Sequence, residues 1–202
     1  MSARAGRIGN VTGAVLVGGA SSRMGCDKAH LPIGGAPSAV RVARLLDGLF
    51  AEVLLVGGDP PAESPGRRVP DGPGPSAALR GLVAALEASS APWLFVAATD
   101  LPLLTPDLVL AIVAWPEADA VVPRTQSGPH PLCALYRVAT VLPVARRRLA
   151  QGALALRGLL DEVTTAWLEP HDVAVIDRDG LALFNVNTPG ELAEVERRIA
   201  AG

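Results

Sequence analysis

Residues 14–28 read Ala-Val-Leu-Val-Gly-Gly-Ala-Ser-Ser-Arg-Met-Gly-Cys-Asp-Lys. The first four residues form an apolar run without polar alternation, which is typical of a parallel strand that is covered on both faces. Glycines follow directly, so backbone N–H groups can approach an anion, while two serine hydroxyls, Arg23 and Lys28 add hydrogen-bond donors and positive charge. This stretch predicts a parallel α/β sheet that binds a polyphosphate at the carboxyl end of its first strand.

Lys28 distinguishes this segment from an ordinary glycine-rich turn. It is the single lysine among the 18 Lys and Arg residues, and it lies inside the candidate loop. The spacing is not that of a P-loop, because no Ser or Thr follows Lys28, and it is not the glycine pattern of a dinucleotide-binding turn. The alternative is a flexible turn with two solvated cations, and the placement of the lone lysine favours phosphate binding.

The rest of the chain repeats the alternation of strands and helices. Apolar runs predict strands at residues 53–56 and 93–96, and further strands, of undetermined direction, at residues 120–122, 133–136 and 181–186. Helical spacing joins one apolar set, Val42, Leu45, Leu46 and Leu49, and a second set, Leu79, Leu82, Val83 and Leu86. Helix N-caps are expected at Thr105 and Thr188, each followed by proline.

This alternation predicts a single three-layer α/β/α Rossmann-like domain with a mostly parallel sheet. No repeat or composition break divides the chain. We expect residues 1–12 to form an N-terminal extension and residues 13–202 to form the domain.

Composition excludes several classes of protein. Hydrophobic types make up 50% of the 202 residues and charged types 19%, which suits a folded core rather than a disordered chain. The formal charge of -2 gives no broad basic surface for nucleic acid, and no apolar run approaches the roughly 18 residues that span a bilayer. Two cysteines, Cys26 and Cys133, form no disulfide framework, which is typical of a reducing cytoplasm. From charge, hydropathy and cysteine content together, we expect a cytoplasmic protein without membrane or nucleic-acid partners.

Two aspartates follow other segments that should reach the same edge of the sheet. Asp71 lies in Asp-Gly-Pro-Gly-Pro, a stiff turn from which its carboxylate could accept hydrogen bonds from a base or ribose, although the same residues are also ordinary turn formers. Asp100 ends an apolar strand, where a carboxylate opposite cationic phosphate contacts suits Mg2+. The alternative for Asp100 is an acid that caps a loop, but Thr105 already serves as the next N-cap.

Together these segments resemble the molybdenum cofactor guanylyltransferases, a branch of the nucleotidyltransferase superfamily. The resemblance covers roughly residues 13 to 200. It rests on the first loop, on Leu31-Pro-Ile-Gly-Gly, and on the motifs that begin at Asp71, Thr99, His130 and Asn185. The last motif, Asn-Val-Asn-Thr-Pro, narrows the resemblance to the molybdopterin branch.

The resemblance implies transfer of GMP from GTP to the phosphate of Mo-molybdopterin, with release of pyrophosphate and Mg2+ as the cofactor. Residues 13–102 would bind the nucleotide and residues 103–202 the pterin. Asp100 would bind Mg2+ and GTP, and Arg23, Lys28 and Asp100 would carry catalysis. The implied nucleotide contacts are Leu16, Val17, Gly18, Gly19, Lys28, Gly57, Asp71 and Asp100.

Four positions bear on how closely the family pattern applies. Family members often have Ala where this chain has Val17, and many have Asn where it has Gly57, so one nucleotide contact could be absent or made by the backbone. The pair Gly18-Gly19 is associated with a guanine base, whereas cytidylyl-transferring relatives usually carry Ala-Gly there. GTP is therefore favoured over CTP, and a cytidylyltransferase for the same pterin remains an alternative.

The second half should receive the pterin through Asn185, Asn187 and His130. In an extended segment the two asparagine side chains share a face and offer paired amides to a pterin edge or a phosphate. The plainer interpretation is that the asparagines only lead into a helix and that His130 belongs to an ordinary loop. The chain could also be a sugar-phosphate nucleotidyltransferase or a non-catalytic pterin carrier. Expected protein partners are those that deliver molybdopterin and the chaperones of molybdoenzymes.

Overall fold

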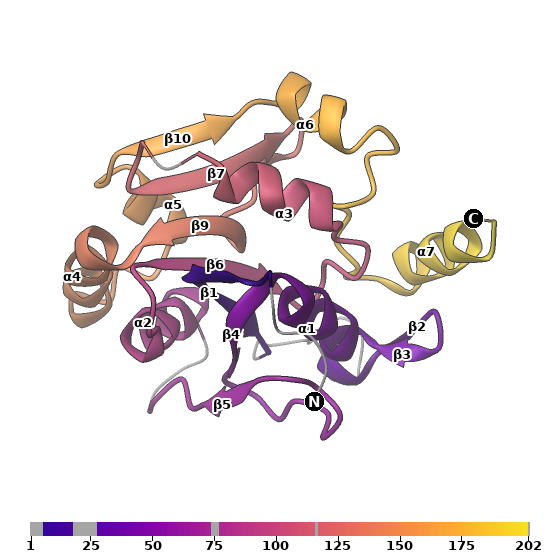
Figure 1. The fold of residues 1–202 in the computed structure, drawn as a ribbon, viewed down its shortest axis with the longest axis horizontal. Coiled ribbons are helices and arrows are strands. Elements are labelled where there is room, and N and C mark those ends of the chain that lie inside the picture. Colours follow the sequence, from indigo (N-terminus) through magenta and orange to yellow (C-terminus); the bar gives the residue numbers. More distant parts are fainter. Residues whose placement is uncertain (1–5, 18–27, 74–76, 116, 202) are drawn as a thin grey trace.

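A mixed, mostly parallel sheet forms the centre of the protein in the computed structural model, which describes residues 6–17, 28–73, 77–115 and 117–201 (Figure 1). Its strand order is β10-β7-β9-β6-β1-β4-β5. Only β9 among these seven runs antiparallel to its neighbours, and β8 pairs with β7 as a short side branch. The strands are β1 (Ile8–Leu16), β4 (Phe50–Val56), β5 (Arg67–Val69), β6 (Trp93–Ala98), β7 (Ala120–Thr125), β8 (Gly128–Pro129), β9 (Cys133–Arg137) and β10 (Thr165–Leu168).

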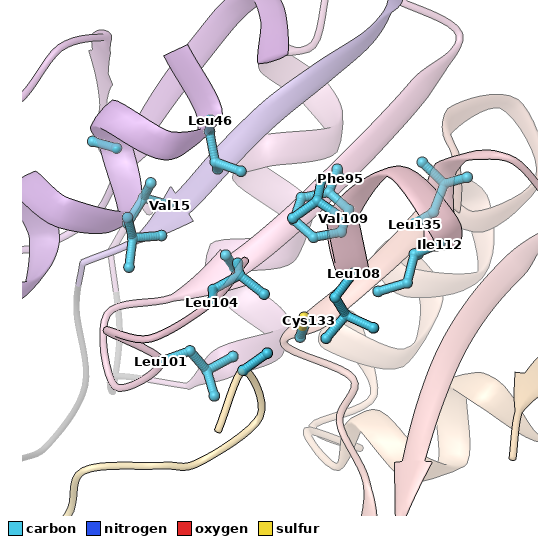
Figure 2. Close-up of a cluster of buried hydrophobic side chains, with 14 of the residues drawn as sticks. Val15, Leu46, Phe95, Leu101, Leu104, Leu108, Val109, Ile112, Cys133 and Leu135 are labelled. Atoms are coloured by element: carbon cyan, nitrogen blue, oxygen red, sulfur yellow. The ribbon is translucent and has the colours of Figure 1, made fainter. Parts of the chain in front are cut away.

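Helices cover both faces of the sheet, as the apolar strand runs predicted. One face packs against α1 (Ser38–Leu49), α3 (Pro106–Val113) and α6 (Pro170–Ile176). The other packs against α2 (Ala78–Ala88), α4 (Val138–Ala150) and α5 (Leu156–Leu160). Because successive side chains of a strand point to opposite faces, Val15 belongs to the first core and Ala14 to the second. Figure 2 shows the first core, in which Phe95 of β6 lies beside the side chains of α3.

A third, smaller apolar cluster lies beside the main domain. The hairpin of β2 (Pro32–Ile33) and β3 (Ala36–Pro37) packs against α7 (Pro189–Ala201), which is drawn in yellow near the C-terminus in Figure 1. Its buried members are Leu31, Ile33, Val186 and Val195. A 3-10 turn, η1 (Lys28–His30), leads into this hairpin, so the C-terminal helix is packed next to the segment that begins at Lys28.

The expected strand at residues 181–186 is wrong. These residues form turns, and the carboxylate of Asp177 accepts the backbone N–H groups of Leu181 and Ala182 at 3.2 and 2.9 Å. Ala182 and Leu183 are buried in the first core and Val186 in the small cluster with Leu31 and Ile33, which explains the apolar run without strand pairing. Edge strand β10 was not anticipated, and β1 begins at Ile8, ahead of the expected apolar run.

The two marked helix starts are present. The Thr105 hydroxyl accepts from the backbone N–H of Leu108 at 3.4 Å, and α7 begins at Pro189 directly after Thr188. Within the described part of the chain, the structure contains no helix that is both long and apolar enough to cross a bilayer.

Candidate functional site

Four segments of the candidate site leave the sheet at one edge. Strands β1, β4, β5 and β6 are parallel, so their carboxyl ends meet, and each is followed by a residue that the sequence singled out. Val17 follows β1, Gly57 follows β4, Asp71 lies two residues beyond β5 and Asp100 lies two residues beyond β6. The topology therefore gathers the predicted nucleotide and metal residues at the edge where such sheets bind ligands.

Backbone hydrogen bonds and close contacts bring Val17, Gly57 and Asp71 together. The N–H of Val17 donates to the Val56 carbonyl, and the N–H of Gly57 to the Val69 carbonyl, both at 2.9 Å. Gly57 has φ +70°, and a Cβ added there would lie 3.0 Å from Oδ2 of Asp71. The Asp71 carboxylate thus occupies space that only a residue without a side chain leaves open.

Lys28 is placed between Asp100 and Asn187, which are distant from it in sequence. Its Nζ lies 2.5 Å from Oδ1 of Asn187 and 4.0 Å from Oδ2 of Asp100. The Asn187 N–H donates to Oε2 of Glu191 at 2.7 Å, and the Val186 N–H donates to the Asp100 carbonyl at 2.9 Å. The single lysine, the predicted metal carboxylate and one of the paired asparagines therefore form one cluster.

Asp100 is electrostatically out of balance in this cluster. Burial raises the pKa of its carboxyl, the charge of Lys28 opposes that rise, and the charge of Glu191 adds to it, so the pKa stays above its usual value. A carboxylate that is partly desolvated and incompletely neutralised is a favourable ligand for an additional cation.

Mg2+ fits this donor set when a triphosphate is present. No group of three or more His, Cys, Asp and Glu in the described ranges is arranged to hold a metal ion. Mg2+ usually keeps several waters and binds through one or two carboxylates together with substrate phosphates. One carboxylate 4.0 Å from the ammonium group of Lys28 therefore suits a metal that arrives with the nucleotide.

A cavity of about 170 Å3 adjoins Asp100 and contains two of the predicted pterin residues, His130 and Asn185. Nε2 of His130 lies 3.0 Å from the Thr125 hydroxyl, and burial lowers the pKa of this histidine, which favours the neutral imidazole. The remaining lining residues are Leu101, Pro129, Pro131, Leu132 and Leu156. Leu156 comes from α5, and no motif in the sequence indicated that it would reach the site.

The structure refines or leaves open the other predicted contacts. Leu16 is 5% exposed and its side chain packs against Gly81 of α2, so only its backbone can reach a nucleotide. Arg23, Gly18 and Gly19 lie outside the described residues.

Comparison with known proteins shows similarity to one family of nucleotidyltransferases. A family model described as the MobA-like NTP transferase domain matches residues 13–175. A molybdenum cofactor guanylyltransferase of Rhodobacter capsulatus is 34% identical over 196 residues, which cover 94% of this chain and 96% of the relative.

Solved structures show the same fold. The molybdopterin-guanine dinucleotide biosynthesis protein A of Archaeoglobus fulgidus superposes with a TM-score of 0.81 at 22% identity, covering 95% of this chain and all of that one. The 2-C-methyl-D-erythritol 4-phosphate cytidylyltransferase of Thermus thermophilus is more distant, with a TM-score of 0.68 and 17% identity over 93% of this chain and 98% of that one.

Proposed function

The chain belongs to the MobA-like NTP transferase family and, within it, to the molybdenum cofactor guanylyltransferases, and we propose on this basis that it transfers GMP from GTP to the phosphate of Mo-molybdopterin. The products are the molybdopterin guanine dinucleotide cofactor and pyrophosphate. The observation that carries this proposal is the convergence of Lys28, Asp100 and Asn187 at the carboxyl edge of the sheet.

In the proposed complex, GTP lies across the ends of β1, β4 and β5. The backbone of Leu16 and Val17 faces its phosphates and ribose, Gly18 and Gly19 are proposed as further nucleotide contacts, and Asp71 accepts hydrogen bonds from the base or ribose. Gly57 contributes backbone rather than a side chain, and its lack of a Cβ keeps Asp71 in place. Lys28 and Arg23 supply positive charge to the triphosphate.

The reaction needs no general base on the protein. The attacking oxygen belongs to the molybdopterin phosphate, which is already ionised at neutral pH. It forms a new bond to the α-phosphorus of GTP as the bond to the pyrophosphate oxygen breaks. Lys28 offsets charge that develops on the leaving pyrophosphate. The nucleotide-binding residues 13–102 and the pterin-binding residues 103–202 hold the reacting atoms in line.

Asp100 is the residue that would hold Mg2+. When bound, Mg2+ supplies neutralising charge to the triphosphate oxygens. Divalent-metal dependence follows from membership of the nucleotidyltransferases, and Mg2+ is proposed because the donors are oxygen atoms.

The pterin is proposed to enter the cavity next to Asp100. Asn185 lies in this cavity with His130, and Asn187 lies nearer to Lys28. A neutral imidazole and an amide can hydrogen-bond to the edge of a pterin ring, while the leucines and prolines contact its faces. Residues 13–102 would thus bind the nucleotide and residues 103–202 the pterin. Two kinds of protein partner are proposed in the cytoplasm. One delivers molybdopterin, and the other consists of the chaperones of molybdoenzymes.

Calorimetric titration of the purified protein with GTP, CTP and ATP, with and without Mg2+, tests the nucleotide half of the proposal. We expect selective binding of GTP that Mg2+ strengthens. A preference for CTP would assign the chain to cytidylyl transfer instead, and binding of none of the three would favour a carrier without catalysis.

A further inference from the structure

Ser38 is the first residue of α1, but its side chain does not cap the helix as a serine at this end often does. A serine hydroxyl at a helix start commonly caps a backbone N–H of the first turn. Here Pro37 occupies the N-cap position and no side chain caps the helix. The Ser38 hydroxyl is buried, with the residue 1% exposed, and donates instead to the carbonyl of Thr99, directly before Asp100.

The backbone of Ser38 holds the segment that carries the opposite charge. Its N–H donates to the Leu31 carbonyl at 2.9 Å, and the Leu31 N–H donates to the Lys28 carbonyl at 3.2 Å. One residue is therefore hydrogen-bonded to both segments of the Lys28–Asp100 pair, through its backbone on one side and its hydroxyl on the other.

Arg41, one helical turn later, repeats this arrangement. Its Nε donates to the carbonyl of Pro102 at 3.2 Å, and its Nη1 to the carbonyl of Ile33 in the β2–β3 hairpin at 3.4 Å. Residues three apart lie on the same side of a helix. The first turn of α1 thus fixes the carbonyl groups of Thr99 and Pro102, which flank Asp100.

We propose that Ser38 is a positioning residue that sets the separation between Asp100 and Lys28, and that Arg41 supports it from the far end of the same turn. The hydroxyl of Ser38 fixes the backbone of the Asp100 turn to the helix that also anchors the Lys28 segment. The carboxylate is thereby held at 4.0 Å from Lys28, close enough to share a metal-bound triphosphate with it. This inference rests on the proposed binding of GTP with Mg2+.

Replacement of Ser38 by alanine removes the hydroxyl bond to Thr99 and keeps the backbone bond to Leu31, so the two can be tested separately. The S38A variant keeps the backbone N–H that holds Leu31, so the Lys28 segment stays anchored, while the Asp100 turn loses its hydrogen bond from the Ser38 hydroxyl. GTP affinity is measured by calorimetry with and without Mg2+. We expect the enhancement by Mg2+ to fall about tenfold, as for a catalytic group displaced by a fraction of an ångström, while affinity without Mg2+ stays within about twofold.

Thr12→Val is the matched control. Thr12 is also fully buried, and its hydroxyl donates to Glu52 at 2.9 Å, but it lies in the middle of β1, which reaches the site only at its last residue, Leu16. T12V therefore removes a buried hydroxyl donor without touching the Asp100 turn, and its enhancement by Mg2+ should equal that of the wild type. The half-buried Arg41 gives a second variant, R41Q, which should lower the enhancement in the same direction even if S38A folds poorly.

The outcomes separate this inference from the proposed function. Absence of Mg2+-enhanced GTP binding in the wild type would contradict the proposed function and this inference with it. Normal enhancement in the wild type that persists in S38A or R41Q would overturn the positioning role alone. An equal loss in T12V would show that general destabilisation, rather than the Asp100 turn, is responsible.

Discussion

Asp100 is a partly buried carboxylate whose charge lowers the stability of the free protein. Burial raises the pKa of its carboxyl, and Lys28, at 4.0 Å, does not compensate fully. In the free protein the ionised side chain is therefore less favourable than it would be in water, and a bound cation relieves this cost. Residues whose native state is strained in this way are typical of functional sites.

Asp100→Asn should abolish metal-dependent turnover and at the same time stabilise the free protein. Asparagine has nearly the same shape and removes the desolvated charge, so we expect Tm to rise by roughly 2–4 °C in the absence of ligand. Turnover should fall by at least about a hundredfold. Asp179→Asn, in an exposed loop, is the control and should change neither quantity. Near-normal turnover in D100N would remove Asp100 from the metal role.

The pKa direction of Asp100 also predicts how nucleotide binding depends on pH. The carboxylate must be ionised to bind a cation, and its pKa lies above the usual value because of burial. Mg2+-enhanced GTP binding should therefore weaken at a higher pH than an ordinary exposed aspartate would give. Calorimetry across a pH series measures this, and a loss that begins only near pH 4 would contradict it.

Gly57→Ala tests the contact between Gly57 and Asp71. The substitution adds a Cβ at 3.0 Å from Oδ2 of Asp71 and at φ +70°, so it both strains the backbone and displaces the carboxylate. Gly152→Ala is the matched control, because Gly152 has φ +71° and nothing lies within 4 Å of its added Cβ. Both variants should lose about 1 kcal/mol of stability. Only G57A should raise the KM for GTP, and equal KM values would argue against the role of Asp71.

At the scale of elements, α7 connects the C-terminus to the site. It packs on the β2–β3 hairpin through Val195, and the segment before it carries Asn187, whose amide oxygen accepts from Lys28. The element is therefore positioned to fix two site segments at once, although its own apolar cluster is small.

Val195→Ala should loosen this element without unfolding the sheet. The substitution leaves a cavity among Leu31, Ile33 and Val186 and should cost about 2 kcal/mol. We expect faster amide hydrogen exchange in α7 and the hairpin, together with a lower kcat, because Asn187 loses its support. Val141→Ala in α4 deletes the same atoms from the opposite core and should leave exchange in α7 and kcat unchanged. Unchanged exchange in α7 of V195A would contradict this account.

The sequence predicts helices and strands well where the signal lies within the element itself. Unbroken apolar runs indicated the inner strands, and Thr105 with its following proline marked the start of α3, because those signals are local. Residues 181–186 were misinterpreted because their apolar side chains are buried in two separate clusters, Ala182 and Leu183 in one and Val186 in the other, which produces the same apolar run as a strand. The edge strand β10 has only four residues, of which Leu168 alone is fully buried, so it lacks the signal of a long apolar run.

The site was predictable as far as it follows from strand ends. The edge rule for parallel sheets brings Val17, Asp71 and Asp100 together without knowledge of any side-chain contact. Tertiary packing decides the remaining features. The approach of Asp71 to Gly57, the entry of Leu156 into the cavity and the bond from Ser38 to Thr99 join segments with no shared motif.

At the scale of the whole molecule, the partly buried carboxylates at the two ends of the sheet have different surroundings. The carboxyl edge holds the unbalanced Asp100, while Glu52, at the other end, is fully satisfied. It accepts hydrogen bonds from Ser90, Arg67 and Thr12. Burial raises the pKa of Glu52, but these hydrogen bonds outweigh it and lower the pKa from 4.5 to about 2.

Glu52 should therefore make global stability depend on pH. Because its folded-state pKa is depressed, its contribution is complete above pH 4.5 and is lost as the pH falls towards about 2. We expect Glu52→Gln to lower the unfolding free energy at pH 7 by about 1–2 kcal/mol, with a difference that shrinks by pH 3. Urea unfolding at both pH values measures this. Glu63→Gln, at an exposed glutamate, should match the wild type at both, and a pH-independent difference for E52Q would contradict the account.

The most direct test of the central claim is product formation by the purified protein. Mo-molybdopterin is incubated with GTP or CTP in the presence of Mg2+, and the dinucleotide cofactor and pyrophosphate are quantified by mass spectrometry and a coupled assay. We expect one pyrophosphate for each molybdopterin guanine dinucleotide formed with GTP, little product with CTP, and none with D100N. Efficient formation of the cytosine dinucleotide, or tight binding of both substrates without any product, would contradict the proposed guanylyl transfer.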